Sequence, residues 1–356
     1  MRGIVSDARR GKAAGAVLLF LPLILSAVAE GGLALVRHVS FFGPEGPLLQ
    51  TARLLYLEHR DTIQYLPECA RYDPATSYVL RPGTCEFSSD EFRTTVRVNR
   101  LGLRDDEESL ARPEMVVLGD SYAMGWGVEQ DETFASLLEA ETGLRVLNAA
   151  VSSYGTARAL GVLSRIDTSA MRYLVIQYAG NDYPENLTFL QNGGRLDIMS
   201  EESYDELVRL HESRRSYYPG MYLMTWIRTW RLGMKAGRPD AILSEGSLLP
   251  AAPRAPQPVN PQTLDEARVF LDVLTKSPVP LEGVQLVVLA IACPGDFVDA
   301  LHREIEATTR PEPLETMKAS HLGLLLSQED YFRLDDHLRP RGHAVIAAHV
   351  REMLDL

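Results

Sequence analysis

Four short apolar runs, separated by helical patterns, are the feature that most constrains how this chain can fold. They occupy residues 115–118, 145–148, 173–178 and 284–292. Each run has the length of a strand and is apolar enough to be buried on both faces of a sheet. Strand–helix alternation of this kind is typical of a parallel sheet covered by helices, with right-handed crossovers. The sequence therefore predicts an α/β domain.

The segments around these runs carry the spacing of amphipathic helices. Apolar residues share one face between residues 132 and 141, and Gly143 follows as a stop. We expect a second helix over residues 156–165 and a terminal helix over residues 340–353 that packs on the sheet. No period between 20 and 50 residues repeats itself, which argues against a solenoid or propeller.

The first forty residues have the pattern of an export or anchoring segment. Basic residues at positions 2, 9, 10 and 12 precede an uncharged apolar stretch over residues 13–29. Extended beyond Glu30, the stretch reaches the roughly 20 residues that a membrane-spanning helix needs. We favour an anchor in a bacterial inner membrane. The alternative is secretion after cleavage near Ala29, since Ala27-Val28-Ala29 has the small-x-small pattern. Either way, the body of the chain is expected on the periplasmic side.

The charge balance bears on the partners of the chain. It has 36 Lys and Arg against 48 Asp and Glu, a formal net charge of −12, and no long basic block in its body. This balance opposes non-specific binding to nucleic acid, so no nucleic-acid partner is predicted.

Composition divides the chain into three parts. These are an N-terminal anchor or signal segment (1–40), an extension with short β-prone runs (41–112), and the main domain (113–356), which has an insertion at about 190–262. Residues 236–262 hold six prolines and are expected to form a surface loop or linker.

The chain has three cysteines. A Cys69–Cys85 disulfide would close a loop of about 15 residues and stabilise by about 3 kcal/mol in an oxidising compartment. The alternative is two unpaired buried thiols. Cys293 ends an apolar run, and we interpret it as a buried strand-end thiol rather than a nucleophile.

Ser121 is the strongest candidate nucleophile. In Gly119-Asp120-Ser121 it follows the run 115–118 directly, at the carboxyl end of a predicted strand, where α/β sheets place their ligands. The run does not match the G-x-S-x-G elbow of α/β-hydrolases, because Ala123 stands where that motif has glycine.

Residues 115–128 resemble the first block of the SGNH (GDSL-like) hydrolase family, which has a Gly-Asp-Ser at such a strand end. The last block, residues 335–343, is similar to the Asp-x-His followed by Gly-His of one branch. That resemblance implies that His337 is the general base and Asp335 its orienting acid, with Asp336 as the other candidate acid.

Two further blocks imply an oxyanion hole. Residues 179–182 resemble the family's Gly-x-Asn-Asp, which gives the Asn181 amide as one donor. In residues 146–156, Ser153 stands where the family has a glycine whose N–H is a donor, and Gly155 is the alternative. The implied donors are thus the Ser121 and Ser153 N–H groups and Asn181.

The resemblance implies a flavodoxin-like three-layer sandwich with a parallel sheet of about five strands, plus an N-terminal apolar helix and a small β-containing extension. It covers about residues 70–190 and 284–356. Residues 99–105 also resemble a segment that precedes the first block in many bacterial membrane-anchored members.

Nucleophilic attack by a serine requires these residue types whatever the family. A serine hydroxyl needs an imidazole to accept its proton, a carboxylate to orient that imidazole, and fixed donors for the oxyanion. Taken singly, Gly-Asp-Ser could be a helix cap, Asn181-Asp182 a turn and Asp335-Asp336 a solvated loop. Their joint occurrence in family order favours catalysis. The histidines at 337, 343 and 349 have no recognisable metal-binding spacing, so we predict neither a metal nor a cofactor.

An aromatic stripe is expected in the insertion, where Tyr222, Trp226 and Trp230 recur every four residues. Core packing is one interpretation, and a lid or platform that stacks on sugar rings is the other.

The expected function is a serine esterase that removes short acyl groups, above all O-acetyl groups on a cell-envelope glycan, through an acyl-Ser121 intermediate. An O-acyltransferase with a sugar hydroxyl as acceptor is the alternative within enzymes. A catalytically silent envelope-binding protein of the same fold is the alternative from another class. The expected partners are an acylated small molecule or glycan and, through the N-terminal helix, the inner membrane.

Overall fold

A computed structural model describes residues 21–37, 46–235 and 259–356 of the chain. The chain forms two compact units. One gathers Met1–Arg60, Glu212–Leu248 and Arg333–Asp335, and the other gathers Asp61–His211, Leu249–Phe332 and Asp336–Leu356. We call them the helical unit and the sheet unit.

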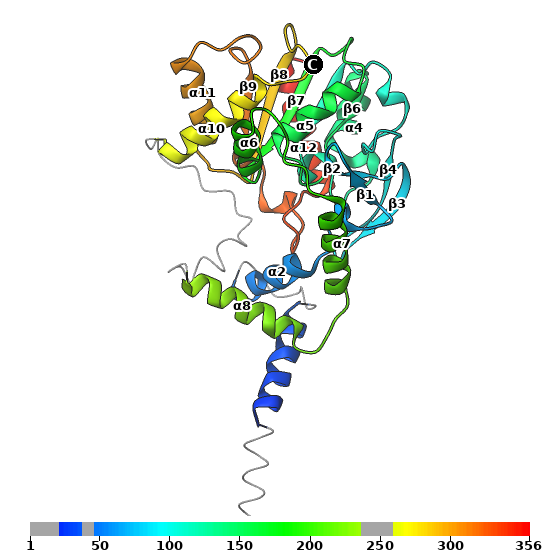
Figure 1. Ribbon diagram of the computed structural model, residues 1–356, viewed down its shortest axis with the longest axis vertical. Coiled ribbons are helices and arrows are strands. Elements are labelled where there is room, and N and C mark those ends of the chain that lie inside the picture. Colours follow the sequence, from blue (N-terminus) through cyan, green and yellow to red (C-terminus); the bar gives the residue numbers. More distant parts are fainter. Residues whose placement is uncertain (1–20, 38–45, 236–258) are drawn as a thin grey trace, which may run out of the picture. The chain divides into compact units, whose positions relative to one another are not determined.

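A five-stranded parallel sheet forms the centre of the sheet unit (Figure 1). Its strands are β5 (Met115–Leu118), β6 (Val146–Asn148), β7 (Tyr173–Ala179), β8 (Gln285–Ile291) and β9 (Lys318–His321), in the spatial order β6-β5-β7-β8-β9. The four predicted runs are confirmed as the first four of these strands. The fifth, β9, was missed because Lys-Ala-Ser-His is a partly exposed edge strand without an apolar run.

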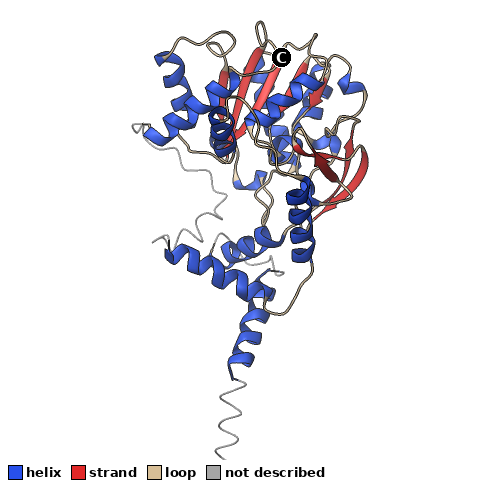
Figure 2. Ribbon diagram, viewed as in Figure 1, coloured by secondary structure: helices blue, strands red, loops and turns tan. Residues whose placement is uncertain are grey.

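Helices cover both faces of this sheet (Figure 2). The helices are α4 (Phe134–Thr142), α5 (Thr156–Gly161), α6 (Asp182–Gln191), α10 (Pro261–Leu274), α11 (Phe297–Ala307) and α12 (Pro340–Leu354). α12 packs against α4, whereas α10 packs against α5, α6 and α11. The β5–β6 step runs opposite to the later steps, so right-handed crossovers put α4 across the sheet from α5, α10 and α11. The predicted three-layer α/β sandwich is confirmed.

Local sequence explains where two of these helices begin and end. The Thr133 side chain accepts from the Ser136 N–H at the start of α4, and Gly143 ends that helix at φ 69°. The start of α10 was predicted as part of the proline-rich loop. Its Pro261 instead occupies the first turn, behind an Asn260 cap, where proline costs no hydrogen bond. Residues 236–258 of the predicted loop lie outside the described residues.

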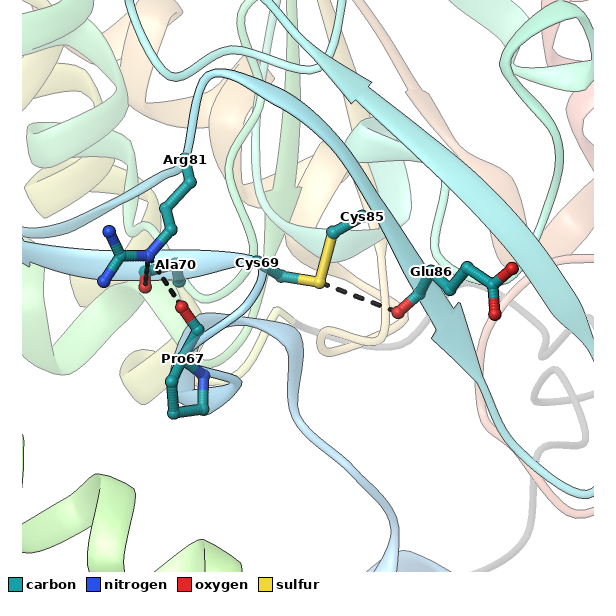
Figure 3. Close-up of a disulfide and its surroundings, with 6 residues drawn as sticks. All are labelled: Pro67, Cys69, Ala70, Arg81, Cys85 and Glu86. Atoms are coloured by element: carbon teal, nitrogen blue, oxygen red, sulfur yellow. Dashed lines mark hydrogen bonds between the residues drawn. A yellow bond between two sulfur atoms is a disulfide. The ribbon is translucent and has the colours of Figure 1, made fainter.

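Two antiparallel hairpins precede the sheet. β1 (Ala70–Asp73) pairs with β2 (Ser77–Leu80), and β3 (Gly83–Ser88) pairs with β4 (Arg93–Val98). A disulfide joins Cys69, just before β1, to Cys85 in β3, with Cα atoms 5.4 Å apart (Figure 3). This is the pairing that the cysteine spacing suggested, and it ties the two hairpins together. The expected small β-containing extension is therefore present.

The helical unit contains a helix over residues 21–37, α2 (Pro47–His59) and α8 (Met221–Lys235). Glu30 is buried, and its carboxylate accepts the Tyr222 and Leu223 N–H groups at the start of α8, at 3.2 and 2.7 Å. α7 (Glu201–Arg215) begins in the sheet unit and ends in the helical unit. Within the described ranges, no helix is long and apolar enough to cross a membrane.

The aromatic stripe lies on α8 and is not uniformly buried. Tyr222 packs with Leu55 and Met221 in a small apolar cluster. Trp226 and Trp230 are 41% and 46% exposed. Core packing therefore describes Tyr222 but not the two tryptophans, which lie farther along the helix.

Candidate active site

Ser121 is the first residue of a four-residue helix, α3 (Ser121–Met124), immediately after β5. Gly119 makes the turn at φ 150°, and a Cβ there would lie 2.5 Å from Oε1 of Gln177. That oxygen accepts the Asp120 N–H at 2.9 Å, and Asp120 Oδ1 accepts the Tyr122 N–H at 2.9 Å. Only glycine fits at position 119, and the resulting turn leaves Ser121 half-buried at the strand end.

The structure brings the predicted nucleophile and base together. Nε2 of His337 lies 2.7 Å from Oγ of Ser121, and Nδ1 lies 3.1 Å from Oδ1 of Asp336. A carboxylate beside Nδ1 favours the tautomer that carries its proton there. Nε2 is then an acceptor, and the serine hydroxyl donates to it. This arrangement prepares Ser121 for proton loss as it attacks.

The two candidate acids occupy different units. Asp336 belongs to the sheet unit and contacts His337 there. Asp335 belongs to the helical unit, is fully buried, and accepts from the Tyr56 hydroxyl at 2.7 Å and from Arg60 at 2.8 Å. The role of Asp335 as the orienting acid stays a prediction. Asp336, the other candidate acid from sequence, is the carboxylate that lies beside Nδ1 of His337.

Two aromatic rings lie against the imidazole of His337. The Trp126 ring is stacked on it, with centroids 4.5 Å apart and planes 13° apart. The Tyr122 ring is tilted at 37°, with centroids 4.9 Å apart. Sequence reasoning missed both roles, although both residues belong to the first block. A ring face beside an imidazole favours its protonated form, which is the form that catalysis creates.

Ser153 adopts the conformation that a glycine would supply. Its φ is 59°, in the left-handed region. Gln64, a buried residue of the short 3₁₀-helix Ile63–Tyr65, holds this turn. Its Nε2 donates to Oγ of Ser153, and its Oε1 accepts from Oγ of Ser152, both at 2.9 Å. Gln64 was missed because nothing near it in sequence resembles a motif. Gly155, the alternative donor, has an ordinary φ of −74° at the start of α5.

The three predicted oxyanion donors follow three neighbouring strands. Ser121 follows β5, Ser153 lies in the loop after β6, and Asn181 is the second residue after β7. The Asn181 side chain hydrogen-bonds to Asp120. An amide group has two donor hydrogens, so a bond to Asp120 does not use up the donor capacity of Asn181. The carboxyl ends of these strands meet at one edge of the sheet, which is where an α/β sheet binds substrate.

Two buried carboxyl groups lie beneath this edge. Burial raises the pKa of Asp120, opposed by the Tyr122 N–H and the nearby His337. Burial and the neighbouring Asp120 raise the pKa of Asp182, whose Oδ2 accepts from the Thr156 hydroxyl at 2.7 Å. Their mutual repulsion disfavours two negative charges beneath the nucleophile. Asp120 caps the helix that begins at Ser121, and Asp182 holds Thr156 at the start of α5.

The remaining titratable candidates have structural surroundings. His343 is buried, its Nδ1 accepts the Phe134 N–H at 3.3 Å, and burial lowers its pKa to about 3. His349 contacts Ser320 at 2.8 Å. Burial raises the pKa of Cys293, which keeps its thiol protonated. These surroundings agree with the non-catalytic interpretation of all three residues.

A metal ion would need ligand atoms that converge. Among the described residues, the consecutive Asp336 and His337 of the sheet unit belong to a group whose possible ligand atoms converge. Both ring nitrogens of His337 are already engaged, by Ser121 and Asp336. These contacts fit His337 as an acid–base residue rather than as a metal ligand.

Comparisons with known proteins return structural likenesses only. No family model matches the chain, and no curated protein sequence matches it. The structure of TesA is 15% identical with a TM-score of 0.35, covering 67% of this chain and 97% of that one. A putative lipolytic protein of the G-D-S-L family from Desulfitobacterium hafniense DCB-2 is 7% identical with a TM-score of 0.34, covering 67% and 98%. Values this low carry no argument about function.

The strands are parallel in the order β6-β5-β7-β8-β9, Ser121 follows β5, and His337 lies before the terminal helix α12. This arrangement agrees with the order of the motifs along the sequence. The sheet unit therefore has the three-layer α/β fold that the sequence predicts.

Proposed function

We propose that this chain is a serine esterase of the SGNH type, which cleaves short acyl esters through an acyl-Ser121 intermediate. The observation that carries the proposal is the 2.7 Å contact between Oγ of Ser121 and Nε2 of His337. The carboxylate of Asp336 on the other ring nitrogen supports it. A hydroxyl, an imidazole and a carboxylate in series are the components of nucleophilic acyl transfer.

The proposed acylation begins when Oγ of Ser121 attacks the carbonyl carbon of the ester and its proton passes to Nε2 of His337. The carbonyl π electrons move to the oxygen, and the resulting oxyanion receives hydrogen bonds from the Ser121 and Ser153 N–H groups and from Asn181. The tetrahedral intermediate then collapses and the C–O bond to the alcohol breaks. The leaving oxygen takes the proton from Nε2.

Deacylation repeats these steps with water. His337 accepts a proton from water, whose oxygen attacks the acyl carbon, and the carboxylic acid leaves as Ser121 regains its proton. If a sugar hydroxyl replaces water, the same residues transfer the acyl group. O-acyl transfer is therefore the second candidate activity, and the acceptor alone separates the two.

The proposed substrate is an O-acetylated glycan of the cell envelope. The Cys69–Cys85 disulfide supports an oxidising compartment, because such bonds persist mainly outside the cytoplasm. The basic, apolar beginning of the sequence supports export to that compartment.

The test of function supplies a small acetyl ester and acetylated envelope polymers to the purified protein, with and without a sugar acceptor. We expect acetate release that Ser121→Ala abolishes. Product on the acceptor in place of free acetate would identify a transferase. If the folded protein and Ser121→Ala give the same background rate on every ester, the catalytically silent interpretation replaces this one.

We also propose that the helical unit meets the inner membrane. Six large hydrophobic side chains of the helix over residues 21–37 are exposed, namely Leu21, Leu23, Ile24, Leu25, Val28 and Leu35. On α8, Trp226 and Trp230 are exposed with Arg228 and Arg231 nearby, and tryptophan with arginine is favoured at a lipid interface. The full chain should remain in the membrane fraction after carbonate extraction. Release of a protein that begins at Glu30 would instead support cleavage and secretion.

A further inference from the structure

The loop that follows the nucleophile is held by a buried arginine from outside the four motif blocks. Arg104 belongs to residues 99–105, between the hairpins and β5, and is fully buried. Its Nη1 donates to the carbonyl oxygen of Met124, at 3.3 Å, and to that of Gly125. Its Nη2 donates to the carbonyl oxygen of Val128. One guanidinium therefore fastens both ends of the turn over residues 124–128.

The backbone of this turn is shaped around the arginine. Gly125 has φ 92°, and a Cβ there would lie 3.1 Å from Nη1 of Arg104 and 2.6 Å from Cγ2 of Thr133. A side chain at position 125 would therefore push the loop away from the guanidinium. The fork of Arg104 and the glycine at 125 fit together as a unit.

The side chain that this turn presents is Trp126. It is buried, and its ring stacks on the imidazole of His337, 4.5 Å between centroids. The ring nitrogen that must receive the Ser121 proton thus belongs to a side chain packed against this turn. A displacement of Trp126 would change the orientation of the base.

A buried arginine is costly unless it satisfies a specific need. Desolvation lowers the pKa of Arg104 to about 10, so the group still carries its charge at neutral pH. Its three described acceptors are backbone carbonyls, so it acts on the path of the loop. A methionine would fill similar volume without that desolvation cost but would take the guanidinium hydrogen bonds from the three carbonyls. Each carbonyl would keep one other donor, namely the Asn148 amide, the Val128 N–H and the Thr94 hydroxyl for Met124, Gly125 and Val128 in turn.

The next residue, Asp105, is hydrogen-bonded to strand β6. Asp105 Oδ2 accepts the Asn148 N–H at the end of β6, at 2.7 Å. The Asn148 amide donates in turn to the carbonyl oxygens of Ala123 and Met124, at 3.3 and 3.4 Å. Arg104 and Asn148 thus converge on Met124, at the end of the helix that begins with Ser121.

We propose that Arg104 is a positioning residue for catalysis. It fixes the turn over residues 124–128, and through Trp126 it fixes the plane of the His337 imidazole against Ser121. The proposal rests on the esterase function. It adds a role for residues 99–105, whose sequence pattern had no function of its own.

The kinetic test compares Arg104→Met, Arg104→Lys, Trp126→Leu and Trp126→Phe on a small ester. Arg104→Met and Trp126→Leu should each lower kcat by about 10- to 100-fold, as expected for a misplaced reacting group. KM should stay within about 2-fold, because neither residue is assigned a substrate contact. Trp126→Phe, which keeps an aromatic face, should recover part of the loss, and Arg104→Lys should recover less because it lacks the fork.

Coupling and a matched control separate positioning from simple instability. The double variant Arg104→Met, Trp126→Leu should lose no more activity than the worse single variant, because both act through one contact. Arg310→Met removes another largely buried arginine of the sheet unit, one that pairs with Asp272 at 2.6 Å. It should lower Tm and leave kcat unchanged. Additive losses, or an unchanged kcat in folded Arg104→Met, would overturn the proposal.

A fluorescence measurement tests the same geometry without turnover. With Trp226→Phe and Trp230→Phe, Trp126 is the sole tryptophan, because the chain has three. An imidazole stacked on an indole quenches its emission, so His337→Ala should brighten the emission of Trp126 when both proteins are compared at one pH. Three other titratable groups face His337, namely Asp336, Asp120 and His343. They are the same in the two proteins of each comparison, which differ only at His337. The brightening should shrink in Arg104→Met, and an equal brightening would contradict the proposal even if the esterase function fails.

Discussion

The Gln64 amide donates to Oγ of Ser153 at 2.9 Å, while Ser153 holds a left-handed φ of 59°. The family resemblance places a glycine here, and a side chain in this region costs roughly 1 kcal/mol or more. The bond from Gln64 offsets part of that cost. The departure from the family's glycine therefore preserves the backbone conformation, and with it the direction of the Ser153 N–H.

Substitution at Ser153 should separate its backbone from its side chain. Ser153→Gly removes the strain and the bond to Gln64 together, so the free energy of unfolding should change by less than about 1 kcal/mol and kcat should persist. Ser153→Pro removes the N–H and also excludes the left-handed φ, because proline fixes φ near about −65°. It should lower kcat by at least about 100- to 1000-fold. Denaturant titration and steady-state kinetics measure the two effects. Full activity in folded Ser153→Pro would remove Ser153 from the oxyanion hole.

The acid that orients His337 is tested by a pair of variants. Asp336→Asn should lower kcat by about 100- to 10000-fold, because an amide favours the wrong imidazole tautomer. Asp335→Asn weakens the contacts to Tyr56 and Arg60 and should lower Tm. Normal kcat in Asp336→Asn, together with a loss in Asp335→Asn, would assign the role to Asp335 as the sequence resemblance implied.

Acid should destabilise the protein through His343. Its folded-state pKa is about 3, below the ordinary 6.5. Between these two values the unfolded chain is protonated at His343 and the folded chain is not. The contribution of neutral His343 to the free energy of unfolding is complete above pH 6.5 and is lost as the pH falls from 6.5 towards 3. At pH 5 the loss relative to pH 7 should be about 2 kcal/mol. Urea titrations of the wild type and His343→Gln should show a smaller acid loss in the variant, and equal losses would contradict this origin.

The disulfide should stabilise the extension without taking part in catalysis. Its cysteines are 16 residues apart in sequence, and closing such a loop is worth about 3 kcal/mol in the chain-entropy model. Cys69→Ala with Cys85→Ala should lower the free energy of unfolding by about that amount. The rate on a small ester should persist below the new Tm. Cys293→Ala, which removes the remaining thiol, is the control, and an equal loss there would point to cavity effects.

Sequence predicted those parts of the molecule that depend on local patterns. The apolar strands β5 to β8 and the capped helix α4 follow from periodicity and capping residues. The strand β9 was missed because its residues pair at an edge and need no apolar run. Helix α10 was missed because its first proline lies in a proline-rich stretch.

The same division holds in the candidate site. Ser121 and His337 were predicted because motif residues at strand ends have recognisable neighbours. Gln64, Arg104 and the ring of Trp126 act through contacts made by chain segments far apart in sequence. A single sequence carries no signal for such contacts, and only the packed structure reveals them.

In the proposed reaction Ser121, activated by His337, becomes acylated. A serine-directed phosphonate, followed by peptide mapping with mass spectrometry, measures this most directly. We expect one covalent adduct, on Ser121, that disappears in His337→Ala while the variant remains folded. Absence of labelling in the wild-type protein, or equal labelling of Ser121 in the wild type and in His337→Ala, would contradict the activation of Ser121 by His337.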